Sequence, residues 1–210
     1  IWGDEQIIDP VGGVEDLKGL QIRVLSGSSF QDDATRIMRA IKYEQRLGMV
    51  LERGTESQLK ANLAMFDTLA KYRLRKELKL WFAESQCSNI LVRASDLGAI
   101  DALDGSINKC IVFIREERFI GCPNVDAENF WVSFMAYFMD YDECMSFITR
   151  FAFESNLSKT IIDTIRLKCL LNTLKYTNEN LSDIHQDMSH YDDVVFNVSK
   201  LVNRCEVGDE

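Results

Sequence analysis

Residues 28–43 read Ser-Ser-Phe-Gln-Asp-Asp-Ala-Thr-Arg-Ile-Met-Arg-Ala-Ile-Lys-Tyr, and this stretch has the pattern of an amphipathic helix. Serine and aspartate at its start suit a helix N-terminus, and Gly48 can end the helix after Leu47. At about 100° per residue, one face is apolar and is expected to enter the core; it carries Ala34, Ile37, Met38 and Ile41. The opposite face carries Arg36, Arg39, Tyr43 and Arg46. The sequence therefore predicts one helix over residues 28–47.

Asp33 and Arg36 are three residues apart, so on such a helix they would point side by side from the first turn. A carboxylate accepts from an amino group, and a guanidinium donates to a ring nitrogen or carbonyl, so together they can read a nucleobase edge. The alternative is an ion pair on a solvated helix surface, and periodicity alone favours that alternative.

The composition is typical of a mainly α protein. The chain of 210 residues has only 2 prolines and 11 glycines, and it is long enough for one large domain or two small ones. No apolar run has the length needed to cross a bilayer, and the N-terminus lacks a signal pattern. Because the first residue is Ile1 and not methionine, we expect a fragment of a longer chain.

Six cysteines lie far apart, without the spacing of a zinc site, and we expect them to be reduced thiols of a cytoplasmic protein. They are Cys87, Cys110, Cys122, Cys144, Cys169 and Cys205. The net charge of −9 is unevenly divided. Residues 1–93 hold 14 Lys and Arg against 13 Asp and Glu, and residues 94–210 hold 10 against 20. Contact with nucleic-acid phosphates is therefore expected in the N-terminal part.

A second and a third helix are predicted after the first. Thr55 and Gln58 have the spacing of a capping box at the start of the second helix. In the third, Leu74, Leu78, Trp81 and Phe82 are expected to face inward, and Arg73, Arg75, Lys76 and Lys79 outward. Arg73 and Glu77 are four residues apart and are expected to pair. The basic cluster could be plain solvated surface, which the pattern alone favours.

The segment Asp140-Tyr141-Asp142 has the spacing of a two-metal carboxylate pair, yet it follows an apolar helix that is expected to begin after Asp126. We therefore predict a solvated junction between two helices there. Residues 107–120 are compatible with either a buried helix or a strand.

Four stretches resemble, in order, motifs of the class II tRNA nucleotidyltransferases and bacterial poly(A) polymerases. Residues 32–36, Asp-Asp-Ala-Thr-Arg, are similar to the Glu-Asp-x-x-Arg motif of the neck domain in that family. Residues 7–18 are similar to the segment that closes the catalytic head. Residues 44–56 are similar to the end of the first neck helix and the following turn, and residues 73–78 to the last neck motif. Lys42 stands where the family has an arginine, which removes bidentate geometry.

The resemblance implies roles for these side chains. In that family the RNA 3′-hydroxyl attacks the α-phosphate of CTP or ATP, and the neck selects the incoming base. Asp33 and Arg36 would then hydrogen-bond the base, with support or phosphate contacts from Asp32, Arg39 and Lys42. A role in RNA binding is implied for Arg46, Arg73, Arg75 and Lys76. Arg73 and Glu77 would mainly hold the neck helices together.

The catalytic carboxylates of the family occur nowhere in the 210 residues. The resemblance thus implies a short β and turn remnant of the head (1–26), a neck (27–95), a helical body (96–154) and a helical tail (155–210). The whole enzyme would add CCA or A to the tRNA 3′ end with Mg²⁺ and ATP, and with CTP in the CCA-adding case. The fragment alone would contain no catalytic residue and no metal ligand and would be inactive. The alternative is a non-catalytic helical RNA-binding or assembly module.

Overall fold

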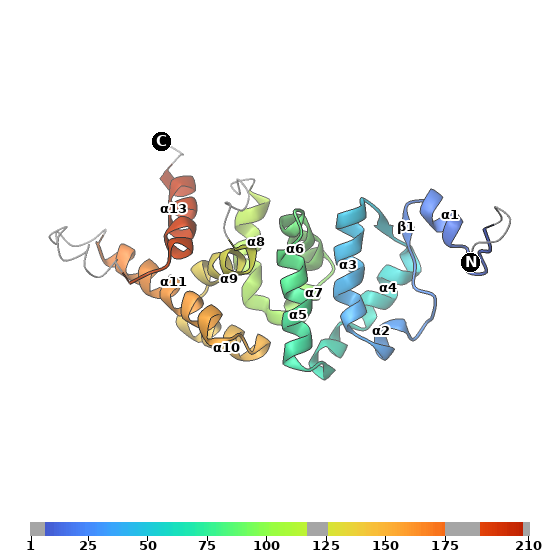
Figure 1. The fold of residues 1–210 in the computed structure, drawn as a ribbon, viewed down its shortest axis with the longest axis horizontal. Helices are drawn as coiled ribbons and strands as arrows, with labels where there is room; N and C mark the ends of the chain where they lie inside the picture. The colour runs from blue at the N-terminus through green and yellow to red at the C-terminus, as the bar shows by residue number, and fades with distance from the viewer. Residues whose placement is uncertain (1–6, 117–125, 175–189, 208–210) are drawn as a thin grey trace. The chain divides into compact units, whose positions relative to one another are not determined.

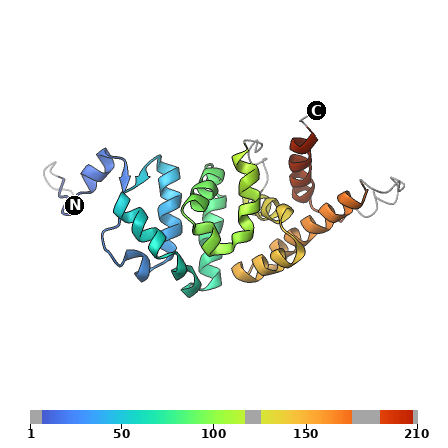
Figure 2. The ribbon, with the colours of Figure 1, turned by 180° about the vertical axis from the view of Figure 1, so that it is seen from behind.

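The computed structural model describes residues 7–116, 126–174 and 190–207 (Figure 1). The chain divides into two compact units between Ala102 and Leu103. The described residues are mainly helical, so the predicted fold class is confirmed. The first unit contains a two-stranded parallel ladder, in which β1 (Gln21–Ile22) pairs with β2 (Val50–Leu51); the two short arrows lie side by side in Figure 2. Parts of the predicted head segment and tail, residues 1–6, 175–189 and 208–210, lie outside the described residues.

The single helix predicted over residues 28–47 is wrong at its start. The structure has two helices there, α2 (Ser29–Asp32) and α3 (Thr35–Leu47). Asp33 separates them in an extended conformation, with φ −154° and ψ 102°. Its carboxylate accepts hydrogen bonds from the Thr35 amide and hydroxyl at 3.0 and 2.7 Å, and this local bonding competes with a continuous helix. The predicted end at Gly48 is confirmed, with φ 61°.

The core of the first unit lies where α3 packs against α5 (Lys71–Phe82) and α6 (Cys87–Asp96). The predicted apolar faces are confirmed, because all their members are buried: Ala34 just before α3, Ile37, Met38 and Ile41 on α3, and Leu74, Leu78, Trp81 and Phe82 on α5. The Trp81 indole also donates to the Met38 carbonyl at 2.9 Å. Apolar burial and this hydrogen bond together fix α5 against α3.

Truncation of Ile41 to alanine should lower the free energy of unfolding by about 2–5 kcal/mol, because the side chain is fully buried and its removal leaves a cavity. Leu47→Ala is the matched control, since Leu47 is 55% exposed at the end of the same helix. Urea unfolding followed by circular dichroism measures both changes. Equal losses for the two variants would contradict the assigned core face.

The predicted capping box at Thr55 and Gln58 is wrong. Helix α4 (Arg53–Ala61) begins after Glu52, whose carboxylate accepts from the Gly54 and Thr55 amides at 2.8 and 2.9 Å. Thr55 therefore lies inside the helix, where it is buried. Two short elements complete the unit before α7, namely α1 (Gly13–Lys18) and the 3₁₀ helix η1 (Leu63–Thr68).

A partly buried ion-pair network joins α3, α4 and α6. Arg93 on α6 donates from Nε to Glu44 Oε2 at 2.7 Å, and its Nη2 donates to Glu44 Oε1 at 3.0 Å and to Glu56 Oε2 at 2.6 Å. Glu44 Oε1 also accepts from the Leu51 amide at 3.0 Å. The network thereby ties the end of α3 to β2 and to two other helices.

The second unit is built around α9. Its helices are α8 (Asn108–Arg115), α9 (Ala127–Phe138), α10 (Tyr141–Phe151), α11 (Ser155–Leu174) and α13 (Asp193–Val207), preceded by α7 (Ala99–Asp104) at the division and the 3₁₀ helix η2 (Gly105–Ile107). Helices α8, α11 and α13 all pack against α9. Its buried aromatic side chains, such as Phe130 and Phe134, form the core. The sequence leaves residues 107–120 open between a buried helix and a strand, and the structure has the helix α8 over Asn108–Arg115. Residues 117–120 lie outside the described residues.

The junction predicted at Asp140 is confirmed. Asp140 caps α10, accepting from the Glu143 amide at 2.9 Å, while the Glu143 carboxylate accepts from the Asp140 amide at 2.8 Å. Asp140 and Asp142 are exposed. Asp140 and Glu143 therefore form a capping box, and the Asp140-Tyr141-Asp142 segment marks a helix start.

None of the helices in the described residues has both the length and the apolar character needed to cross a membrane.

Candidate functional site

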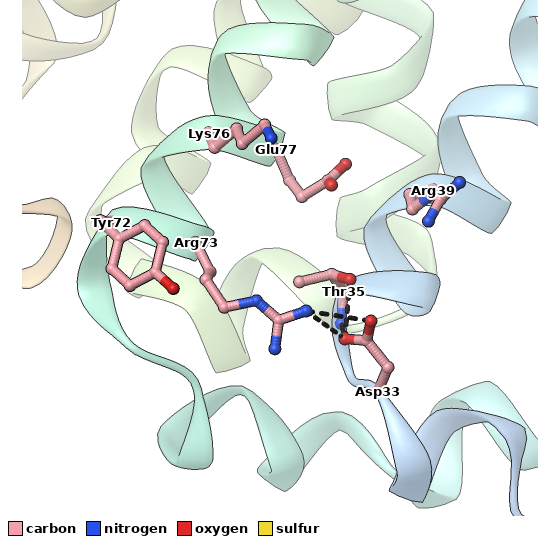
Figure 3. Close-up of a pocket in the computed structure, with 7 residues that line it drawn as sticks. All are labelled: Asp33, Thr35, Arg39, Tyr72, Arg73, Lys76 and Glu77. Carbon is pink, nitrogen blue, oxygen red and sulfur yellow. Dashed lines mark hydrogen bonds and ion pairs between the residues drawn. The ribbon is translucent and has the colours of Figure 1, made fainter.

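A pocket of about 310 Å³ opens in the first unit between the start of α3 and the first half of α5 (Figure 3). The residues that line it are mostly polar or charged: Asp33, Thr35, Arg39, Tyr72, Arg73, Lys76 and Glu77. The stretch that separates α2 from α3 supplies Asp33, and α5 supplies four of the seven side chains. The pocket therefore depends on the break at Asp33 and on the packing of α5 against α3.

Asp33 is a hydrogen-bond acceptor in the pocket lining. Its Oδ1 accepts from the Thr35 amide and hydroxyl and from Arg73 Nη2, the last at 2.9 Å. Its Oδ2 accepts from the same Arg73 nitrogen at 3.0 Å. Burial acts to raise the pKa of Asp33, but the Thr35 hydrogen bonds and the Arg73 charge outweigh it and lower the pKa below its ordinary value of 3.8. Asp33 is thus a carboxylate at neutral pH.

The pocket lining also includes a second acidic side chain, Glu77 on α5, and two further cations, Arg39 on α3 and Lys76 on α5. Glu77 is 9% exposed, and its Oε2 has no hydrogen-bond partner among the described residues. Among the residues that the structure describes, neither Arg39 nor Lys76 forms an ion pair. In Figure 3 the Glu77 carboxyl group points from α5 into the space between α5 and α3. The pocket thus offers both acceptors and donors to a polar ligand.

Two predicted contacts around the pocket are wrong. The sequence predicts Asp33 beside Arg36, but Asp33 is not helical, and Arg36 Nη1 donates instead to the carbonyl and hydroxyl oxygens of Ser29 at 3.0 Å each. The sequence also predicts that Arg73 pairs with Glu77 on the same helix, but the Arg73 guanidinium pairs with Asp33. Because Asp33 is fixed by Thr35, it presents a preformed carboxylate that attracts Arg73 across the pocket.

The pocket contains four of the nine side chains for which the sequence predicts nucleotide or RNA binding: Asp33, Arg39, Arg73 and Lys76. Asp32 is exposed and accepts from the Ser28 hydroxyl at 3.0 Å. Lys42 is only 5% exposed, and its ammonium lies 5.1 Å from the centroid of the Tyr43 ring. Arg46 pairs with Glu84 at 3.5 Å. Arg75 is half-buried on α5 outside the lining.

Sequence reasoning missed three lining residues, Thr35, Tyr72 and Glu77, as parts of a site. Thr35 follows Asp33 by two positions, which is the spacing at which an aspartate caps the next turn, so the signal was available. Tyr72 is 63% exposed, and its position at the pocket rim depends on tertiary packing. The sequence pairs Glu77 with Arg73, but the Arg73 guanidinium donates to Asp33 instead.

Acidification should test the Asp33 interactions. A carboxylate with a lowered pKa stabilises the fold at every pH above its unfolded-state pKa, and this stabilisation is lost as the pH falls through the folded-state pKa. We therefore expect Asp33→Asn to melt below the original chain between about pH 5 and 7, with the gap closing as the pH falls through 3.8 and below. Thermal unfolding at stepped pH measures this gap. A gap that is unchanged at pH 2 would contradict the lowered pKa.

Comparison with known proteins gives the same indication as the motifs. An A-adding tRNA nucleotidyltransferase of Geobacter sulfurreducens is 40% identical over 96 residues, which are 45% of this chain and 11% of that protein. The enzyme of the same name from Aquifex aeolicus is 41% identical over 87 residues, or 40% of this chain and 11% of that protein. The chain is related to the tRNA nucleotidyltransferases. No protein family model matches it.

Solved structures of nucleotidyltransferases share the fold. A CCA-adding enzyme in complex with CTP aligns with a TM-score of 0.70 and 26% identity, covering 92% of this chain and 49% of that one. The resemblance found in the sequence is therefore confirmed. The chain spans about a tenth of the length of the two A-adding relatives and about half of the CCA-adding enzyme.

Proposed function

We propose that this chain is the nucleobase-selecting and tRNA-binding part of an enzyme that adds A or CCA to the 3′ end of tRNA. The observation that carries the proposal is the fixed Asp33 carboxylate in a pocket lined by three basic side chains, on a chain related to tRNA nucleotidyltransferases. Such a pocket can hold a nucleotide by its base edge and by its negative charge.

Asp33 accounts for a preference for ATP and CTP. Adenine and cytosine carry an exocyclic amino group, at N6 and N4, where guanine and uracil carry a carbonyl oxygen. A carboxylate accepts a hydrogen bond from the amino group and repels the carbonyl oxygen. A single acceptor can therefore distinguish adenine and cytosine from guanine and uracil. Thr35 fixes the Asp33 side chain before the ligand arrives, which lowers the cost of ordering the site.

The cations of the pocket supply donors and charge. Arg39 and Lys76, which line it from α3 and α5, suit a ring nitrogen, a carbonyl or a phosphate of the bound nucleotide. Arg36 acts from outside the lining by holding α2 through Ser29, and a direct contact with the base would require Nη1 to leave Ser29. Asp32, Lys42, Arg46 and Arg75 are peripheral to this pocket, so we assign the base selection to Asp33.

The described residues do not fit the Mg²⁺ ions that phosphoryl transfer in this family uses. No group of three or more His, Cys, Asp or Glu side chains in this described part could hold a metal ion. Ligands for the metal would have to come from elsewhere in the enzyme. We expect the enzyme to work in the cytoplasm, where thiols such as those of Cys87 and Cys110 remain reduced.

Two measurements test the proposal. Nuclear magnetic resonance titration of the 210-residue chain should show pocket signals shifting with ATP and CTP at lower concentrations than with GTP and UTP. The complete protein that contains these residues should add A, or CCA, to tRNA transcripts that lack them, whereas the 210 residues alone should add nothing. Binding of tRNA without nucleotide preference or addition would instead indicate a non-catalytic RNA-binding module.

A further inference from the structure

Glu77 has no role in the base selection described above, yet it is a buried side chain of the pocket lining with one unsatisfied carboxylate oxygen. Its side chain is nine-tenths buried, and among the described residues its Oε2 has no hydrogen-bond partner. A buried acceptor without a partner costs free energy. A state of the pocket in which this oxygen accepts a hydrogen bond would recover that cost.

Arg73 is the donor best placed to provide that bond. It precedes Glu77 by four residues on α5, and side chains at this spacing lie next to each other on a helix surface. Here its guanidinium extends away from Glu77 and reaches across the pocket to Asp33 (Figure 3). A change of Arg73 side-chain rotamer, without movement of the helix, would bring the two together.

The same Arg73 contact occupies the acceptor that a base needs. Asp33 Oδ1 already accepts three hydrogen bonds, two from Thr35 and one from Arg73, so Oδ2 is the oxygen with capacity left for a ligand. Oδ2 accepts from Arg73 Nη2 at 3.0 Å, and the guanidinium spans the pocket to reach it. An amino group that approaches Oδ2 therefore competes with Arg73 for both the oxygen and the space.

We propose that Arg73 exchanges partners when the pocket is filled, moving from Asp33 in the empty pocket to Glu77 when a nucleobase amino group binds Asp33. In the empty pocket, Arg73 neutralises the Asp33 carboxylate and competes with weakly binding ligands for it. When a correct base displaces the Arg73 guanidinium, the guanidinium pairs with Glu77. Glu77 is a positioning residue in this scheme and does not touch the base. The proposal rests on the proposed function, because it takes the ligand to be ATP or CTP.

The exchange is observable in the side-chain Nε–Hε signal of Arg73 in the 210-residue chain, assigned by its loss in Arg73→Gln. Without nucleotide, Asp33→Asn should shift this signal and Glu77→Gln should leave it in place. With saturating ATP, Glu77→Gln should be the variant that shifts it. The dispersion of the amide spectrum reports whether each variant is folded.

Affinity gives the second readout. Glu77→Gln should weaken ATP binding about 10-fold, because the displaced Arg73 loses a charged partner. In the Arg73→Gln background the same change should alter affinity less than about twofold, since no guanidinium remains to be received. Glu84→Gln is the matched control, because Glu84 pairs with Arg46 away from the pocket lining and should leave ATP affinity unchanged.

Each contrary result has a distinct meaning. If Glu77→Gln weakens ATP binding equally in both backgrounds, Glu77 contacts the ligand itself and the exchange is wrong. If ATP binds through Asp33 while the Arg73 signal stays that of the Asp33 pair, the exchange is wrong and the proposed function stands. If neither ATP nor CTP shifts any pocket signal, the proposed function fails and the exchange fails with it.

Discussion

Asp33→Ala should abolish the preference for ATP and CTP over GTP and UTP, with a loss of affinity for the two preferred nucleotides of about 30-fold. The estimate follows from removing a hydrogen bond to a charged group, which contributes about 1.5–3 kcal/mol. Affinity for GTP and UTP should rise or stay level, because the repulsion between the carboxylate and a base carbonyl is also removed. Titration of the 210-residue chain with each nucleotide measures both effects.

Asp32→Ala is the control for this substitution. It removes a carboxylate from the neighbouring position, where the side chain is exposed and meets the Ser28 hydroxyl outside the pocket lining. Asp33→Ala also removes the cap at Thr35, for which a stability loss of about 1 kcal/mol is expected, so the chain should stay folded. If the two variants discriminate the four nucleotides equally well, Asp33 is not the base-selecting residue.

Much of this fold could be predicted because helical periodicity depends on local sequence. The buried face of α3 and that of α5 follow from apolar residues three and four apart, and the structure buries every one of them. Gly48 and Asp140 could be identified as helix ends because their chemistry acts on the adjacent backbone. These are features that a few neighbouring residues determine by themselves.

The pocket could be predicted only in part, because its contacts join residues that are distant in sequence. Local spacing pointed to pairs within one helix, Asp33 with Arg36 and Arg73 with Glu77. The structure instead joins Asp33 to Arg73, 40 residues away. An exposed ion pair at helical spacing stabilises the fold by only a few tenths of a kcal/mol. The Arg73 guanidinium therefore pairs preferentially with the preformed, partly buried Asp33 carboxylate. Only tertiary packing of α5 on α3 brings these two side chains together.

The Glu44 and Arg93 pair, near the C-terminal end of α3, shows the same limit of sequence reasoning. Local sequence spacing does not predict this ion pair, because Glu44 on α3 and Arg93 on α6 are 49 residues apart in the sequence. Glu44 even belongs to a polar position of the helical pattern, yet its side chain is 4% exposed. A charge is buried there only because a guanidinium and the Leu51 amide both meet it.

Arg93→Ala should therefore lower the free energy of unfolding by about 3 kcal/mol, because it leaves the buried Glu44 carboxylate without its cation. The hydrogen bond to Glu44 raises the pKa of Arg93 above its ordinary value, despite the opposing effect of burial, so the guanidinium is charged at every pH of interest. Its removal leaves Glu44 buried with only the Leu51 amide as a donor, and it frees Glu56 from α6. Urea unfolding followed by circular dichroism measures the loss.

Arg53→Ala is the matched control, because Arg53 is an exposed arginine at the start of α4 and its removal should cost less than about 0.5 kcal/mol. A second variant separates the lost ion pair from lost packing. When Glu44→Gln is added to Arg93→Ala, the buried charge is removed, and part of the stability should return. If the double variant is instead less stable than Arg93→Ala by the full cost of Glu44→Gln alone, the two residues are not coupled, and α3 is fixed against α6 by apolar packing.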